Sequence, residues 1–96
     1  GDSLYVGSDN RLIAMDLESV EKRWEFETGG IIRSSPVISG STVYIGSEDG
    51  RLYALDIATG EKFWDVLIGG IISSSPAVVD GTLYVGSQDG ILYAIK

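Results

Sequence analysis

The chain has 96 residues, a formal net charge of −7 and neither cysteine nor histidine, which suits one small domain and excludes several classes of function. Nucleic acid is not expected as a partner, because its phosphates are bound by clustered lysine and arginine, and here 14 acidic residues outnumber 7 basic ones. Disulfides, thiolate metal sites and histidine-dependent nucleophiles are excluded. No apolar run approaches the roughly 20 residues of a membrane-spanning helix.

The chain repeats itself with a period of 40 residues. The octad GGIIRSSP at 29–36 returns as GGIISSSP at 69–76, and Trp24, Asp16 and Pro36 each recur 40 positions further on. A third, partial copy appears when three segments of similar sequence are aligned: 4–16, 43–56 and 83–95. A repeat of this length indicates an array of equal structural units, which together form one repeat domain over 1–96.

Each copy is predicted to form short β-strands, because apolar residues alternate with period two in runs rich in β-branched and aromatic side chains. About ten strands are expected in chain order: three in 1–28, four in the middle copy and three in 74–96. The four strands of the middle copy are expected at 34–39, 42–47, 51–56 and 62–68.

Turn residues separate these predicted strands. Gly40 stands between the first and second strands of the middle copy, and Glu-Asp-Gly at 48–50 and Gln-Asp-Gly at 88–90 suit a tight hairpin whose residues need positive φ. In the first copy Asn10 is expected to take that conformation. Short turns of this kind make each copy an antiparallel meander.

A second kind of turn joins the third and fourth strands. The Asp56 carboxylate is expected to accept backbone N–H groups there, while Gly60 takes a left-handed conformation. The first copy has Val20 at the position of Gly60, so its turn is predicted to be strained.

A unit of 40 residues with four antiparallel strands is typical of a β-propeller blade. The fold class is therefore predicted as all-β, a partial propeller of about two and a half blades. A partial blade covers 1–28, a full blade covers 34–68 and a second partial blade covers 74–96. Because each sheet is apolar on both faces, neighbouring blades must cover it.

The sequence ALDIATGEKFW at 54–64 resembles the Ala-x-Asp-x-x-Thr-Gly-x-x-x-Trp pattern of the PQQ-type (pyrroloquinoline quinone-like) propeller repeat family, and the resemblance covers essentially the whole chain. It implies that the tryptophan ring packs against the glycine-containing turn of the adjacent blade. Trp24 should then lie near Gly60, whereas Trp64 would need the turn of a further blade. The implied blade-docking residues are Ala14, Asp16, Trp24, Ala54, Asp56, Gly60 and Trp64.

Other candidate residues have a structural explanation. The carboxylates of Asp9, Glu48, Asp49 and Asp89 lie at predicted hairpin tips, where they favour turns rather than acid–base catalysis and lack the spacing of a calcium loop. The Gly-Gly pairs at 29–30 and 69–70 are interpreted as crossovers between blades, since neither precedes a helix or a lysine.

Arg33 and Ser73 are the one difference within the repeated octad. Both precede the innermost strand of a blade and should face the central channel. Arg33 is the candidate for an anionic contact there, and the alternative is a solvated charge.

The function expected is that of a non-enzymatic propeller module without a cofactor or metal, which binds copies of itself as a dimer or trimer and offers a surface to another protein. Self-association is expected because two and a half blades cannot close into a ring, so that unpaired strands and apolar faces would remain exposed. The resemblance also implies a periplasmic or extracellular location.

Two alternatives stay open. The chain could be a fragment of a quinoprotein dehydrogenase, although the resemblance then implies quinone and calcium ligands that include amides and often a cysteine pair, and Asn10 is the one asparagine present. It could also be a ligand-sensing domain of a bacterial receptor.

Overall fold

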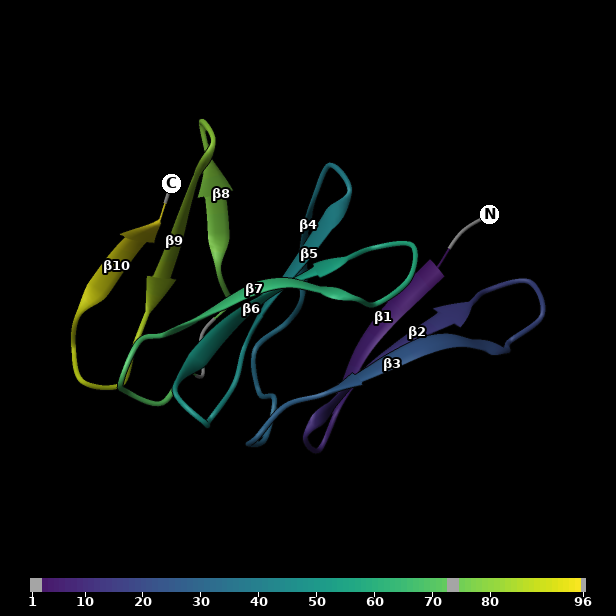
Figure 1. Cartoon of the computed structure of the whole chain (residues 1–96), viewed down its shortest axis with the longest axis horizontal. Helices are drawn as coiled ribbons and strands as arrows, with labels where there is room; N and C mark the ends of the chain where they lie inside the picture. Colours follow the sequence, from purple (N-terminus) through teal and green to yellow (C-terminus); the bar gives the residue numbers. More distant parts are fainter. Residues whose placement is uncertain (1–2, 73–74, 96) are drawn as a thin grey trace.

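The computed structural model describes residues 3–72 and 75–95, and within these residues the chain is all-β, as predicted (Figure 1). The first sheet has three strands: β1 (Ser3–Ser8), β2 (Arg11–Asp16) and β3 (Lys22–Glu27). The second has four: β4 (Val37–Ser39), β5 (Thr42–Gly46), β6 (Arg51–Asp56) and β7 (Lys62–Leu67). The third has three: β8 (Ala77–Val79), β9 (Thr82–Gly86) and β10 (Leu92–Ile95).

Every sheet is an antiparallel meander in which strands follow one another in chain order. Three strands of the middle copy agree with the predicted positions to within one residue, but β4 begins at Val37 instead of residue 34. The Ser34 hydroxyl explains this difference, because it exchanges hydrogen bonds with the backbone N–H and C=O of Gly46, each at 3.1 Å. A side chain thus replaces the expected backbone ladder, and Pro36 has no N–H to extend it.

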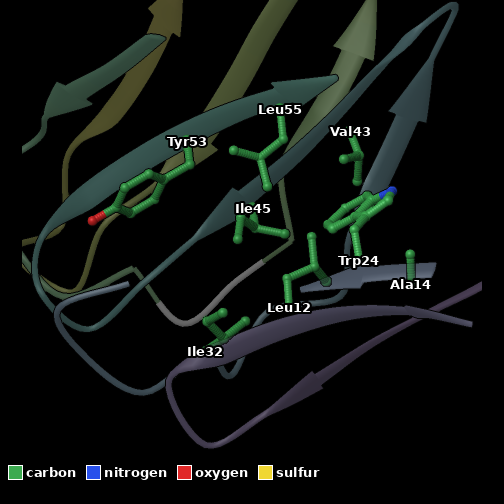
Figure 2. Close-up of a cluster of buried hydrophobic side chains, with 8 residues drawn as sticks. All are labelled: Leu12, Ala14, Trp24, Ile32, Val43, Ile45, Tyr53 and Leu55. Atoms are coloured by element: carbon green, nitrogen blue, oxygen red, sulfur yellow. The ribbon is translucent and has the colours of Figure 1, made fainter. Parts of the chain in front are cut away.

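The three sheets lie side by side in chain order, with β1–β3 at one end and β8–β10 at the other (Figure 1). One cluster of buried apolar side chains fills the space between the first and second sheets, as Figure 2 shows. A second cluster, built from Leu52, Ile72, Leu83 and Val85, fills the space between the second and third. The four-stranded sheet is therefore covered on both faces, as a propeller blade is.

The turns behave as their sequences predict, with one correction. Gly50 and Gly90 have φ of 85° and 86° at the hairpin tips, and Val20 is held at φ 57°, in the left-handed region that Gly60 occupies at 78°. In the first hairpin, however, the residue with positive φ is Asp9 and not Asn10.

Asn10 has a different part in this hairpin. Its side-chain amide donates to the Thr28 carbonyl at 3.1 Å, and its own carbonyl accepts the Thr28 N–H at 2.7 Å. These two hydrogen bonds tie the tip of the β1–β2 hairpin to the residue after β3. The turn of this hairpin is one residue shorter than the turn at 48–50, and the residue with positive φ is Asp9, one position before the predicted Asn10.

Candidate functional site: the interfaces between sheets

The Trp24 ring lies between the first and second sheets, where it is 8% exposed (Figure 2). Its indole N–H donates to the Ile57 carbonyl at 3.1 Å. A Cβ added at Gly60 would lie 2.5 Å from the ring carbons Cδ2 and Cε3. This is shorter than a van der Waals contact, so the two groups would clash. Only glycine at this position lets the ring lie directly on the backbone of the turn.

The 56–60 turn that receives the ring is held by its own backbone. The Asp56 carboxylate accepts the Ala58 N–H at 2.9 Å, and the Asp56 carbonyl accepts the Gly60 N–H at 2.8 Å. The Asp56 N–H closes the turn by donating to the Glu61 carbonyl at 2.8 Å. The turn under Trp24 is therefore held by hydrogen bonds of its own, which do not involve the ring.

The 16–20 turn of the first sheet repeats this construction. Asp16 accepts the backbone N–H of Glu18 at 2.8 Å and of Ser19 at 3.4 Å, and these bonds lower the pKa of its carboxyl group. The Val20 N–H donates to the Asp16 carbonyl at 2.8 Å, as Gly60 does to Asp56. The 16–20 turn therefore has the backbone conformation of the turn that contacts Trp24, but it carries the Val20 side chain at the position where the other turn has Gly60.

The two alanines of the motif lie beside the two tryptophans. Ala14 pairs with Trp24 across β2 and β3, and Ala54 pairs with Trp64 across β6 and β7. Both alanines are fully buried, and a register shift follows each of them. A small residue at this position leaves the cross-strand space to the indole ring.

Trp64 has the same local pose but no platform. Its ring lies 6.0 Å from that of Tyr44 at an interplanar angle of 48°, compared with 5.9 Å and 43° for Trp24 and Tyr5. The side of Trp64 that faces the third sheet opens into a groove of about 390 Å³, lined by Tyr44, Val66, Val78, Leu83 and Ile95. Trp64 is 37% exposed, and no described residue accepts its indole N–H.

Asp49 lies in the β5–β6 hairpin, at the end of β6 that is opposite to the 56–60 turn, and it binds the crossover after the first sheet. Its carboxylate accepts the Gly29 N–H at 3.0 Å, the Arg51 N–H at 2.9 Å and the Tyr53 hydroxyl. Burial of the Tyr53 ring, with Asp49 beside it, raises the pKa of the phenol to about 12. A Cβ added at Gly30 would lie 2.5 Å from the Asp49 N atom, so the hairpin tip rests on the backbone of the crossover.

This contact was not recognised from the sequence, where Asp49 was interpreted as a turn former alone. A signal does exist, because the third copy repeats it. The Tyr93 hydroxyl donates to Asp89 at 3.3 Å, and burial together with Asp89 raises the pKa of Tyr93. An aspartate followed four residues later by tyrosine in both copies marks the contact.

Arg33 forms an ion pair with Glu48, which links the crossover after the first sheet to the β5–β6 hairpin. The guanidinium stays exposed to solvent, and the anion contact expected for Arg33 in a central channel stays a prediction. Ser73, the matching residue of the next copy, lies outside the described residues.

The carboxylates of Asp49 and Asp89 each accept a backbone N–H two residues on in their hairpin turns. The Asp89 carboxylate accepts the Ile91 N–H at 3.0 Å, and this hydrogen bond lowers the pKa of Asp89. Across 3–72 and 75–95, no three acidic side chains are placed to hold a metal ion together. The same stretches contain no helix long and apolar enough to cross a membrane.

Comparison with protein families and with solved structures gives a consistent result. The model of a family described as "Outer membrane protein assembly factor BamB" matches residues 1–96. Among solved structures, BamB from Moraxella catarrhalis superposes with a TM-score of 0.82 at 28% identity, over 98% of this chain and 30% of that one. No curated protein matches the chain.

Two dehydrogenases show the same fold. A europium-containing methanol dehydrogenase has a TM-score of 0.83 at 20% identity, and the quinohemoprotein alcohol dehydrogenase ADHIIG from Pseudomonas putida HK5 has 0.86 at 22%. The chain covers 21% and 17% of these two enzymes, although 98% and 96% of its own length is aligned. It therefore spans less than a third of the length of each of these three solved structures.

Proposed function

The chain belongs to the PQQ-repeat propeller family, the one described as outer membrane protein assembly factor BamB, and from this membership we propose that it is a non-enzymatic scaffold that binds copies of itself and a further protein. The family description also supports a periplasmic or extracellular location. The tryptophan-and-turn contact is, on this proposal, the means by which one blade docks on the next.

One observation carries the proposal: the side chains of the repeat motif make packing contacts and hydrogen bonds between neighbouring sheets. The hydrogen bond of Trp24 to Ile57 and its close approach to Gly60 join two sheets, and the hydrogen bond of Asp49 to Gly29 ties the second sheet to the crossover after the first. The apolar groove beside Trp64 is a surface of the same kind without a neighbour. Large exposed apolar surfaces mark protein contacts.

Solution mass tests the self-associating part of the proposal. Light scattering on the purified chain at high micromolar concentration should give two or three times the 10.3 kDa of one copy. A stable monomer under these conditions would contradict self-association. Thermal melts at two protein concentrations provide the control, because the melting temperature of an oligomer rises with concentration.

A quinone-binding segment is the second candidate, since the Trp64 groove offers two aromatic rings and apolar walls. Titration of pyrroloquinoline quinone with calcium, followed by tryptophan fluorescence, separates the two functions. We expect no saturable quenching at micromolar quinone. Saturable quenching that is lost in Trp64→Ala but kept in Trp24→Ala would support the cofactor function instead.

A further inference from the structure

We propose that Asp80 and Gly81, at the tip of the β8–β9 hairpin, form a site of spontaneous modification at which the aspartate converts to isoaspartate through a succinimide. The chain contains three Asp-Gly dipeptides, at 49–50, 80–81 and 89–90. The folded structure holds the reacting groups of two of them in hydrogen bonds and leaves those of the third free. This inference does not depend on self-association or on a scaffold function.

The reaction needs only the two residues themselves. The backbone nitrogen of the residue after aspartate attacks the side-chain carboxyl carbon, and a C–N bond forms. The carboxyl hydroxyl and the proton of the nitrogen leave together as water. A second water then opens the five-membered imide at either carbonyl, which restores aspartate or gives isoaspartate, whose backbone runs through the side-chain methylene. Glycine at the second position favours the attack because no side chain hinders it.

Asp80 and Gly81 form a two-residue turn in which φ is positive at both positions, 51° and 79°. Val79 and Thr82 close the turn as the last pair of the two strands. The left-handed region is open to glycine without cost, whereas aspartate adopts it under some strain. Isoaspartate has one more rotatable backbone bond, so the turn favours the product at this position.

Both reacting groups of this turn are free. Among residues 3–72 and 75–95, nothing hydrogen-bonds the Asp80 carboxylate or accepts the Gly81 N–H. Both residues are exposed, and a Cβ added at Gly81 would meet no atom within 4 Å. The nitrogen can therefore approach the carboxyl carbon without breaking a hydrogen bond.

The equivalent turn of the middle copy, Gly40 and Ser41, shows the same freedom in a sheet that is packed on both faces. The Ser41 carbonyl accepts the Ile57 N–H at 2.9 Å, whereas no described residue accepts the Ser41 N–H. A Cβ added at Gly40 also meets no atom within 4 Å. Neighbouring sheets thus leave the attacking nitrogen of this turn uncovered.

The other two Asp-Gly dipeptides are held at the nitrogen. The Gly50 N–H donates to the Ser47 carbonyl at 3.1 Å, and the Gly90 N–H donates to the Ser87 carbonyl at 3.0 Å. Each of these hydrogen bonds must break before the nitrogen can attack, and breaking it raises the barrier to the reaction.

These two dipeptides are held at the carboxylate as well. Asp49 accepts the N–H groups of Gly29 and Arg51 at 3.0 and 2.9 Å. Asp89 accepts the Ile91 N–H at 3.0 Å, and this hydrogen bond lowers the pKa of Asp89. Water leaves the neutral acid more easily than the carboxylate can expel an oxide, so a lowered pKa leaves less of the reactive form.

The experiment ages the purified chain at neutral pH and physiological temperature and follows the three dipeptides by mass spectrometry. Electron-transfer fragmentation distinguishes isoaspartate from aspartate and locates it in the sequence. Isoaspartate should accumulate at Asp80 at least about tenfold faster than at Asp49 or Asp89, a ratio that corresponds to about 1.4 kcal/mol of activation free energy. In guanidinium chloride, where these hydrogen bonds are absent, the three sites should react at similar rates.

Two variants of Asp80 and one matched control sharpen the test. Asp80→Asn should react faster than the wild type, because ammonia leaves an amide more readily than water leaves a carboxyl group. Asp89→Asn is the control and should react at least about tenfold more slowly than Asp80→Asn, a ratio set by the same barrier difference. Asp80→Glu should abolish the modification at this position, since glutamate would have to close a six-membered ring. Near-ultraviolet circular dichroism checks that each variant is folded.

Several outcomes would overturn the inference. Equal rates at the three sites of the folded chain would show that the hydrogen bonds at Asp49 and Asp89 give no protection. A rate at Asp80 that is more than about tenfold lower in the folded chain than in guanidinium chloride would show that the turn itself keeps the reacting groups apart. Neither result would bear on the proposed scaffold function, which solution mass tests separately.

Discussion

The two tryptophans of the chain hold the same position in the repeat, yet one is enclosed and the other is open. Each lies beside a fully buried alanine and is tilted against a tyrosine at nearly the same distance. The difference comes from the 56–60 turn, which covers Trp24, whereas among the described residues no such turn lies over Trp64. The strand sequence therefore sets the pose of the ring, and the neighbouring blade decides whether the ring contributes to stability.

Alanine substitution of the two rings should give the largest effects and should separate them. Trp24→Ala should lower the free energy of unfolding by roughly 3–5 kcal/mol, because it leaves a cavity between two sheets. Trp64→Ala should cost less than half as much, since the groove beside it is already open to solvent. Urea denaturation of both variants measures the two values.

Equal losses for Trp24→Ala and Trp64→Ala would break the comparison. They would mean that a turn from another chain covers Trp64 in solution. Repeating the measurement at two protein concentrations controls for this, because stability supplied by a second chain depends on concentration.

Exchanging the residues that end the two equivalent turns should give the next largest effect. Gly60→Val adds a side chain in the left-handed region and against the Trp24 ring, and should cost about 2–4 kcal/mol from strain and overpacking together. Val20→Gly removes strain without touching a ring and should stabilise the chain by up to about 1 kcal/mol. Thermal unfolding of the two variants should therefore shift in opposite directions.

The two variants test the contact through the sign of their stability changes, which should be opposite. If Gly60→Val were as mild as an exposed substitution, the ring would not rest on the turn. If Val20→Gly destabilised the chain, the Val20 side chain would be making contacts that the single copy does not show.

The parts of the fold that depend on nearby residues were predictable. The strands β5, β6 and β7 and the turns at Gly50 and Gly90 follow from alternation and from local turn chemistry. The proximity of Trp24 and Gly60 required more, because 35 residues lie between them, and it was expected only from the resemblance to the propeller repeat family.

What could not be predicted depends on single side chains that reach across the structure. Ser34 shortens β4 by binding the backbone of Gly46, and Asp49 accepts the N–H of Gly29 in the crossover between the first and second sheets. Neither contact follows from the alternation of apolar residues, and the Asp49 contact is marked only by the aspartate–tyrosine spacing that the third copy repeats. The exposure of Leu4 and Leu92, by contrast, agrees with the expectation that apolar faces of the first and last blades remain exposed.

The contact of Tyr53 with Asp49 should make the enclosed interface sensitive to high pH. The pKa of Tyr53 is raised from 10.0 to about 12, so the folded state favours the neutral phenol. The stability that this provides is fully present below about pH 10 and is lost as the pH rises toward 12. Urea titrations across this range should show a steeper decline for the wild type than for Tyr53→Phe, which has no phenol to ionise.

Tyr93→Phe is the matched control for this prediction. Tyr93 makes the same kind of bond to Asp89 at the more exposed third hairpin, and its replacement should leave the steep decline of the wild type in place. If stability stayed constant with pH in Tyr93→Phe while Tyr53→Phe declined as steeply as the wild type, the pH dependence would come from Tyr93 and the prediction would be wrong.

The smallest expected effect belongs to the ion pair of Arg33 and Glu48, which joins the enclosed interface from the outside. Arg33→Ser with Glu48→Gln gives these two positions the residues that Ser73 and Gln88 hold in the next copy. Since the guanidinium is exposed, a double-mutant cycle should give a coupling energy under about 1 kcal/mol that disappears near 1 M salt. A larger coupling that survives salt would mean that the pair is shielded from water, and this would require a neighbouring chain over the crossover.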